Sequence, residues 1–418
     1  MSNLKGTVPM TGLARDGGTP VRSTPLPTVM DSTGRRFGDE EVKAAERVLR
    51  SGMLSATWGT EVPALEQEFA DVLGAGHAVA CSSGTAALHL AVAAVDPAPG
   101  DEIITTPISD MGTVFPILMQ NAVPVFADVD PVTGNLDPAA VAAAVTPRTR
   151  AVMAVHLFGK PAPIVELREL CDQHGLVLVE DCAQAYLAPA GDTLAGRIGH
   201  IGCFSLQQTK HISAGDGGLV VTDDAALARR MRLFADKGWP RATNERDYLF
   251  LALNYRMTEL AGAVTRAQLT RLAGVVADRR TAAARATAGI AELAGVTAPP
   301  DSGDHVYWQY PLILDPAVAC DLREWAAALT AEGIPANGGY LTSPLYGAPA
   351  LRDRVTYGHS HFPLQDVEYP VGLCPTAEDL IDHRLLVLPW NENYTTEDVD
   401  DIVTAIRKVH SVLSKEAG

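Results

Sequence analysis

The stretch LVLVEDCAQA, residues 176–185, decides the fold class of this chain. It starts with an uninterrupted apolar run, residues 176–179, which two acids follow directly, Glu180 and Asp181. A run that is apolar at every position, rather than at alternate positions, is typical of a strand covered on both faces. The acids at its end need partners, because a desolvated carboxylate is costly.

Six similar apolar runs lie on either side of this one. They are residues 77–81, 102–106, 123–127, 151–157, 202–206 and 218–222. Helical segments such as 85–95 and 164–174 lie between them. Strands that alternate with helices favour an α/β fold with a mostly parallel sheet, here of seven strands.

The rest of the chain predicts three parts. Residues 1–24 are polar and rich in Gly, Thr and Pro, and we expect a loosely ordered arm over about residues 1–37. Residues 38–285 would form the large domain. Beyond the boundary marked by Pro299 and Pro300, a strand-like run at 307–314 and helices at 322–332 and 396–413 predict a smaller α+β domain over 286–418.

Composition excludes several classes of function. The net charge of −17 works against binding to nucleic acid or to anionic membranes. No apolar stretch approaches the roughly 20 residues of a membrane helix, and the first residues contain no signal-like apolar core. We therefore expect a cytoplasmic location. The six cysteines lack metal-binding spacing and predict reduced thiols without a metal site.

A small-residue turn, Ser83-Gly84-Thr85, follows the first strand and opens a helix. The free amides and positive dipole of a helix start suit a phosphate, and Gly84 allows close approach of the backbone. Either hydroxyl could add a hydrogen bond. The alternative is an ordinary N-cap.

Two further strand ends carry groups that suit amine chemistry. Asp181 could pair with a protonated pyridine nitrogen, which keeps the ring an electron sink; a helix cap or a salt bridge is the alternative. Lys210 lies in a glycine-lined loop between two strands, where partial burial would favour the neutral, nucleophilic amine. A solvated loop lysine is the alternative.

Together these segments resemble the DegT/DnrJ/EryC1/StrS family of sugar aminotransferases. The ordered matches are Ser-Gly-Thr, the Val-His-Leu-Phe-Gly of 155–159, Glu-Asp-x-Ala-Gln-Ala, Phe204-Ser205 followed by Lys210, Gly-Asp-Gly-Gly, and the Asn-Tyr-Arg-Met of 254–257. The resemblance covers about residues 38–410. It implies fold type I of the pyridoxal-phosphate enzymes, an aspartate-aminotransferase-like architecture.

The resemblance also implies roles for individual residues. Lys210 would hold pyridoxal 5′-phosphate as a Schiff base and shuttle protons, and Asp181 would pair with the pyridine nitrogen. Gln184 would lie near the ring hydroxyl. The phosphate contacts would be Ser83, Gly84, Thr85 and Ser205, together with Asn254 from a partner subunit. That last match implies a homodimer with shared active sites.

Two positions qualify the resemblance. The family often stacks an aromatic residue on the ring at the fourth position after the proline that ends the second strand. That proline is Pro107 here and the fourth position is Met111, whose thioether can also pack on a ring. A deoxygenating branch of the family replaces the lysine with histidine. Lys210, with His211 after it, disfavours that branch.

The predicted function is amino transfer from glutamine or glutamate to a keto-sugar or cyclitol ketone, of the kind that builds amino sugars or aminoglycosides. Two half-reactions at one site predict ping-pong kinetics. A dehydration or aromatisation that uses the same cofactor remains open, as does a non-catalytic regulatory role.

The acceptor itself is not fixed by these motifs. The candidate substrate residues are His156, His211, Arg256 and Tyr340. Lys160, Tyr346 and Trp390 could also reach the site, although a packing or ion-pair role is at least as plausible for each. Basic residues before Asn254 could serve a nucleotide-sugar diphosphate; these are Lys237, Arg241 and Arg246.

Overall fold

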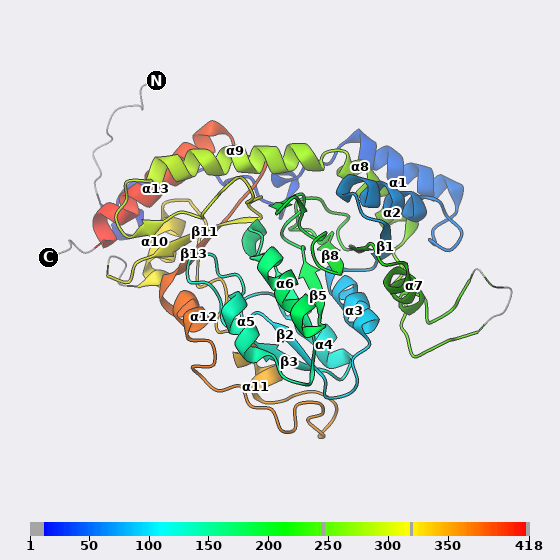
Figure 1. The fold of residues 1–418 in the computed structure, drawn as a ribbon. Coiled ribbons are helices and arrows are strands. Elements are labelled where there is room, and N and C mark those ends of the chain that lie inside the picture. Colours follow the sequence, from blue (N-terminus) through cyan, green and yellow to red (C-terminus); the bar gives the residue numbers. More distant parts are fainter. Residues whose placement is uncertain (1–11, 242, 244–246, 318–320, 415–418) are drawn as a thin grey trace.

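The protein is described by a computed structural model that covers residues 12–241, 243, 247–317 and 321–414. Figure 1 shows a central sheet with helices packed on it and a second, smaller region that carries the last helix. Among these described residues, no helix is both long and apolar enough to cross a bilayer.

A seven-stranded sheet forms the large domain, in the order β1-β9-β8-β5-β4-β2-β3. Only β9 runs against its neighbours, and the other pairs between β8 and β3 are parallel. The strands are β1 His77–Cys81, β2 Glu102–Thr105, β3 Val123–Phe126, β4 Thr149–Val155, β5 Val177–Asp181, β8 Ile201–Ser205 and β9 Gly218–Thr222. The predicted mostly parallel α/β sheet is confirmed, and each of its seven strands overlaps one of the predicted runs.

Helices cover both faces of this sheet, which is why its strands are largely apolar on both sides rather than at alternate positions. Successive residues of β5 enter different cores: Leu178 packs in the cluster that contains Leu167, and Val179 packs in the cluster that contains Leu90. The helices are α1 Asp39–Ser51, α2 Glu61–Leu73, α3 Gly84–Val95, α4 Phe115–Met119, α5 Pro138–Ala144, α6 Ile164–His174, α7 Ala225–Phe234 and α8 Glu259–Leu269. A short hairpin, β6 Pro189–Ala190 and β7 Thr193–Leu194, follows β5.

The smaller domain has an antiparallel sheet in the order β10-β11-β13-β12. Its elements are β10 Val296–Thr297, β11 Gln309–Leu314, α10 Leu322–Ala331, β12 Asn337–Gly338, α11 Pro349–Arg352, α12 Pro375–Asp379, β13 Leu385–Pro389 and α13 Thr396–Leu413. Before it, α9 Leu272–Ile290 runs along the top of Figure 1. The predicted boundary between residues 285 and 286 falls inside α9 and stays a prediction.

The described part of the N-terminal arm is fastened to the small domain. The buried Glu332 carboxylate accepts hydrogen bonds from the Ala14 and Val21 amides at 2.8 and 3.0 Å. Arg22 pairs with Asp398 at 2.7 Å, and Leu13 is fully buried. A loosely ordered arm is therefore wrong for residues 12–37, because buried long-range partners hold them. Residues 1–11 lie outside the described residues.

Candidate active site

The carboxyl ends of β1, β2, β4, β5 and β8 meet at one edge of the large sheet, since these strands share one direction. The start of β9 completes this edge, because Gly218 is paired with both Cys81 and Ser205. In open α/β sheets this edge is where ligands bind. Most of the predicted site residues follow these strand ends.

The turn after β1 packs tightly against the end of β8. A Cβ atom added to Gly84 would lie 2.6 Å from the Ser205 Cβ, so only glycine allows this approach. The Ser83 hydroxyl accepts a hydrogen bond from the Ala86 amide at 3.0 Å and caps α3. The structure thus brings Ser83, Gly84 and Ser205 together at a helix start, a place suited to a phosphate.

Asp181, the last residue of β5, is buried at this edge. Its carboxylate accepts hydrogen bonds from the Thr113 hydroxyl and from the Ala183 amide, both at 3.1 Å. Burial raises its pKa, while these two donors and the nearby Lys210 act in the opposite direction. The carboxylate is therefore held in place with few partners, and a further cationic partner would stabilise its charge.

Lys210 is half-buried in the loop between β8 and β9. Burial lowers the pKa of its amine to about 8, while the carboxylates of Asp181 and Asp110 act to raise it. The amine nitrogen lies over the Trp308 ring, 4.0 Å from its centroid. An amine with such a pKa is available in its neutral, nucleophilic form near neutral pH.

Asp110 and Met111 occupy the turn after β2. The Asp110 side chain is exposed, and one of its oxygens accepts a hydrogen bond from the Gly112 amide at 2.7 Å. Met111 is half-buried against the apolar cluster that contains Ile108 and Leu118. Thr85 borders the same turn, since a Cβ added to Gly112 would lie 2.7 Å from its hydroxyl oxygen. Stacking of Met111 on a ring stays a prediction.

Gln184 and Tyr340 form a second wall near Asp181. The Gln184 side-chain oxygen accepts a hydrogen bond from the Phe158 amide at 2.6 Å, and the Gln184 side chain is also hydrogen-bonded to the Tyr340 hydroxyl. Tyr340 packs edge-on against Phe158, with ring centroids 5.0 Å apart. Burial is the main cause of the raised pKa of Tyr340, and Asp110 and Asp181 add to it. Of the four predicted substrate residues, Tyr340 is therefore the one placed near both acids.

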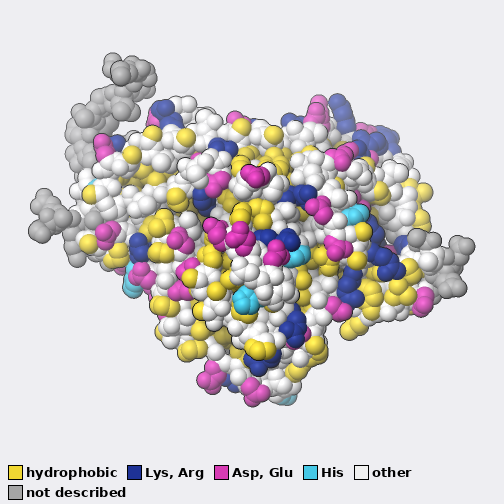
Figure 2. All heavy atoms as spheres, in the orientation of Figure 1, with side chains coloured by type: hydrophobic (Ala, Val, Ile, Leu, Met, Phe, Trp, Pro, Cys, Tyr) yellow, Lys and Arg dark blue, Asp and Glu magenta, His cyan; other side chains and the backbone are white. Residues whose placement is uncertain are grey.

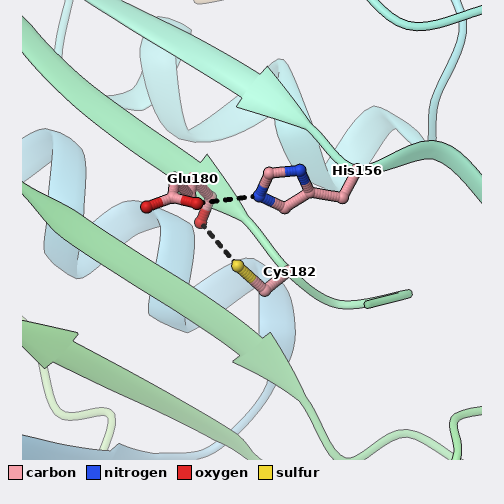
Figure 3. A group of neighbouring side chains, drawn as sticks. All are labelled: His156, Glu180 and Cys182. Atoms are coloured by element: carbon pink, nitrogen blue, oxygen red, sulfur yellow. Dashed lines mark hydrogen bonds and ion pairs between the residues drawn. The ribbon is translucent and has the colours of Figure 1, made fainter. Parts of the chain in front are cut away.

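His156, Glu180 and Cys182 cluster on the other side of β5 (Figure 3). The His156 Nε2 lies 2.9 Å from Glu180, and its Nδ1 accepts a hydrogen bond from the Ala162 amide at 3.0 Å. The Cys182 thiol faces the Glu180 carbonyl, and burial raises its pKa well above its usual range. These three could be metal ligands by type. They already form a hydrogen-bonded network, and the fully buried His156 faces protein atoms rather than a substrate cavity.

His211 and Lys160 are engaged in the structure of the domain junction. His211 is buried, and its Nε2 donates to the Val306 carbonyl at 2.9 Å. Burial lowers its pKa well below the usual range. Lys160 pairs with Asp304 at 2.6 Å. The Lys160 amine is thus bound to Asp304, while the buried Nδ1 of His211 has no hydrogen-bond partner among the described residues.

Arg256 and Asn254 lie in a different part of the chain. Arg256 forms an ion pair with Asp236, and the exposed Asn254 is bridged to the same residue through the backbone. Arg256, Arg241 and Arg229 line a cavity of about 360 Å³ beside α7, where Figure 2 shows basic side chains gathered. No residue around Lys210 lines this cavity.

The other basic and aromatic candidates have local partners where they are described. Lys237 and Arg241 pair with Asp236, and Arg246 lies outside the described residues. The Tyr346 hydroxyl donates to Glu378 at 2.5 Å, and the Trp390 indole donates to the Arg279 carbonyl at 3.0 Å. The packing interpretation therefore fits both rings.

The model of one protein family matches residues 35–407, nearly the whole described chain. The chain belongs to the DegT/DnrJ/EryC1/StrS aminotransferase family. This confirms the predicted family and makes the chain an aminotransferase by class.

Several named aminotransferases and a solved synthase structure match this chain along most of their own length. The chain is 36% identical to L-glutamine:2-deoxy-scyllo-inosose aminotransferase of Streptomyces kanamyceticus, over 95% of this chain and 96% of the relative. It is 36% identical to UDP-N-acetyl-3-dehydro-alpha-D-glucosamine 3-aminotransferase of Acidithiobacillus ferrooxidans, over 84% of this chain and 89% of the relative. The crystal structure of 3-amino-5-hydroxybenzoic acid synthase superposes with a TM-score of 0.83 at 27% identity. The match covers 93% of this chain and 100% of the synthase chain. The predicted aspartate-aminotransferase-like fold is confirmed.

Three residues of this site were not predicted from the sequence: Trp308, Asp110 and Thr113. Thr113 and Asp110 lie in the turn that the Met111 argument already singled out, and an inspection of every polar residue there would have found them. Trp308 comes from the segment before β11. No local pattern connects it to Lys210.

Proposed function

We propose that this chain is a pyridoxal-phosphate-dependent aminotransferase that moves an amino group from glutamine or glutamate to the ketone of a keto-sugar or cyclitol. The observation that carries the proposal is the pair of Lys210 and Asp181 at one sheet edge. An amine of lowered pKa lies there beside a buried, sparsely bonded carboxylate.

The residues present fit this cofactor at each of its polar ends. Gly84 has no side chain at its close contact with Ser205, so it does not cover the first backbone amides of α3, which a phosphate would need. Asp181 has the burial and the lack of a cationic hydrogen-bond donor that suit a protonated ring nitrogen. The amino group of Gln184 also bonds the Tyr340 hydroxyl, and its second hydrogen would be donated to a ring hydroxyl.

When bound, pyridoxal phosphate would supply an aldehyde that condenses with amines and a ring that withdraws electrons from the neighbouring carbon. Lys210 would bond to that aldehyde and later hold and return the proton moved on the substrate. Asp181, fixed by Thr113 and the Ala183 amide, would keep the ring nitrogen protonated. Met111 would pack on the ring and Tyr340 would border the acceptor.

The choice of donor and acceptor rests on the relatives. One is named for glutamine as donor and for an inosose, a cyclitol ketone, as acceptor, and another for a nucleotide-linked 3-keto-sugar. Both acceptors are polyhydroxylated cyclic ketones, so this class is proposed for the present chain, in the synthesis of amino sugars or aminocyclitol antibiotics.

A homodimer with shared active sites and a cytoplasmic location complete the proposal. Asn254 is exposed on a segment whose neighbours Leu251 and Leu253 are also exposed, Leu251 to 94%. Along α1, the apolar side chains of Val42 and Leu49 face outward as well. Apolar surface of this extent favours a protein partner, and a second copy would bring Asn254 toward a phosphate site.

The test uses the purified full chain. Incubation with pyridoxal phosphate should give a visible absorption band, and glutamine should bleach it. Addition of an inosose or a nucleotide-linked keto-sugar should restore the band and release the aminated product. A chain that stays colourless contradicts the proposal.

A second candidate, dehydration or aromatisation of a cyclic substrate, is favoured by one observation. The structure superposes on a synthase whose named product, 3-amino-5-hydroxybenzoic acid, contains an aromatic ring. Mass spectrometry of the product separates the candidates, because aromatisation removes water, whereas amino transfer replaces the ketone oxygen with one hydrogen and an amino group and keeps every hydroxyl.

A further inference from the structure

The indole ring of Trp308 lies directly under the amine of Lys210, with 4.0 Å between the amine nitrogen and the ring centroid. We propose that Trp308 is a positioning residue: its ring face receives the Lys210 ammonium whenever the lysine is not bonded to the cofactor. This inference rests on the proposed aminotransferase function, in which the lysine is repeatedly released and bonded again.

The indole is held by contacts that fix its place relative to the lysine loop. Its Nε1 donates a hydrogen bond to the carbonyl of Thr209, the residue before Lys210, at 2.8 Å. The backbone amide of Trp308 donates a hydrogen bond to the Phe158 carbonyl at 2.8 Å, and the backbone carbonyl of Trp308 accepts one from the buried Arg279 at 3.2 Å. Trp308 is only 8% exposed, so the ring cannot move away from the loop without breaking these bonds.

The ring acts on the lysine through its charge distribution. The face of an indole is the most favourable aromatic surface for a cation. Burial opposes the charged amine here, and the carboxylates of Asp181 and Asp110 favour it. The ring adds a third favourable contact. It also keeps the ammonium at a defined position, so the amine stays within reach of the bond it must remake.

A purely structural role for Trp308 makes a different prediction. If the indole only fills space between the domains, the titration of Lys210 depends on ring volume and not on the electron density of the ring. Fluorination of tryptophan withdraws electron density from the ring and changes its size very little. The two roles are therefore separable in a protein that keeps its packing.

The experiment measures how fast the full-length, cofactor-free chain captures pyridoxal phosphate between pH 6 and pH 10. Capture joins the amine nitrogen to the aldehyde carbon with loss of water, and the ammonium must first give its proton to solvent. The rate constant, followed by visible absorbance, therefore reports the pKa of Lys210. In the unsubstituted chain we expect a midpoint near pH 8.

Incorporation of fluorotryptophans with increasing fluorine content at all five tryptophans should lower this midpoint step by step. Trp308→Leu, which removes the ring, should lower it by about 0.4–1.5 pH units, the range that corresponds to a cation–π contact. Trp308→Phe should give a smaller shift in the same direction. In the Trp308→Phe protein, fluorotryptophan should have no further effect.

Trp325→Phe is the matched control, because Trp325 is a fully buried indole in the small-domain core. It should leave the midpoint unchanged. An unchanged midpoint in both the fluorinated chain and Trp308→Leu overturns the inference while leaving the aminotransferase proposal intact. A chain that shows no visible band at any pH overturns the proposed function and this inference with it.

Discussion

Glu180 and Asp181 are consecutive residues at the end of β5, yet their surroundings are opposite in kind. The Glu180 carboxylate accepts hydrogen bonds from His156 and from the backbone amides of Gly196, Ile198 and Gly199, at 2.5–2.9 Å. Within the described part of the chain, the Asp181 carboxylate accepts hydrogen bonds from the Thr113 hydroxyl and the Ala183 amide alone. Successive side chains of a strand point to opposite faces, so one acid enters a finished network and the other faces the Lys210 side.

This difference teaches which buried acid is structural and which is functional. A carboxylate with a full set of donors stabilises the fold and needs nothing more. A carboxylate with few donors and a raised pKa is poorly stabilised in its charged form, and a bound cation would stabilise that charge. A matched pair of acid-to-amide substitutions can test the contrast.

Asp181→Asn should have the largest effect on function. The amide cannot hold a proton on the ring nitrogen by charge, so aminotransferase activity should fall by about 10²–10⁴-fold. The free energy of unfolding of the cofactor-free chain should hold or rise, because a buried carboxylate is removed. The measurement combines steady-state kinetics with denaturant unfolding. Retention of full activity would show that Asp181 is structural after all.

Glu180→Gln should show the reverse pattern. One oxygen replaces two, and the backbone donors of the 196–199 segment lose part of their acceptor. We expect the free energy of unfolding to fall by about 2–4 kcal/mol, the range for damage to a buried charged network. The visible band with pyridoxal phosphate should remain. An unfolding curve that matches the unsubstituted chain would contradict the assignment of Glu180 to the fold.

Lys210→Met should raise the stability of the cofactor-free chain at pH 7. The pKa of Lys210 is about 8 in the folded state and 10.5 ordinarily, so below pH 8 folding has to accommodate an unfavourable ammonium. Its removal should stabilise the chain by about 1–3 kcal/mol after allowance for solvent screening. The gain should fade as pH rises from 8 to 10.5, where the folded lysine is already neutral. A gain that does not depend on pH would contradict the lowered pKa.

Asp110→Asn should have the smallest effect. The exposed Asp110 carboxylate helps to keep Lys210 protonated, so its loss should lower the pKa of Lys210 further, by less than about one pH unit. The pH profile of cofactor capture measures this shift, and added salt should shrink it. An unchanged profile would place Asp110 outside the reach of the amine.

The sequence was sufficient for the large sheet and for the strand-end residues. Runs such as 176–179 are apolar throughout because both faces are covered, and parallel strands bring Asp181 and the Ser83 turn to one edge. Local pattern is enough for these features, since a strand end fixes where its next side chains lie.

The sequence was not sufficient for contacts between distant segments. Trp308 reaches Lys210 because its amide is bonded to Phe158 and Tyr307 adopts a positive φ of 50°, and neither has a local signature. The order of residues 12–37 depends on distant partners such as Glu332 and Asp398. Gly- and Pro-rich composition predicts the lack of helix there and says nothing about such partners.

The central claim is that Lys210 bonds to the cofactor. Borohydride reduction of the chain loaded with pyridoxal phosphate, followed by peptide mass spectrometry, tests it most directly. The account predicts one modified peptide, with the phosphopyridoxyl group on Lys210, and none in Lys210→Met. Modification of another lysine at full occupancy, or of none, would contradict it.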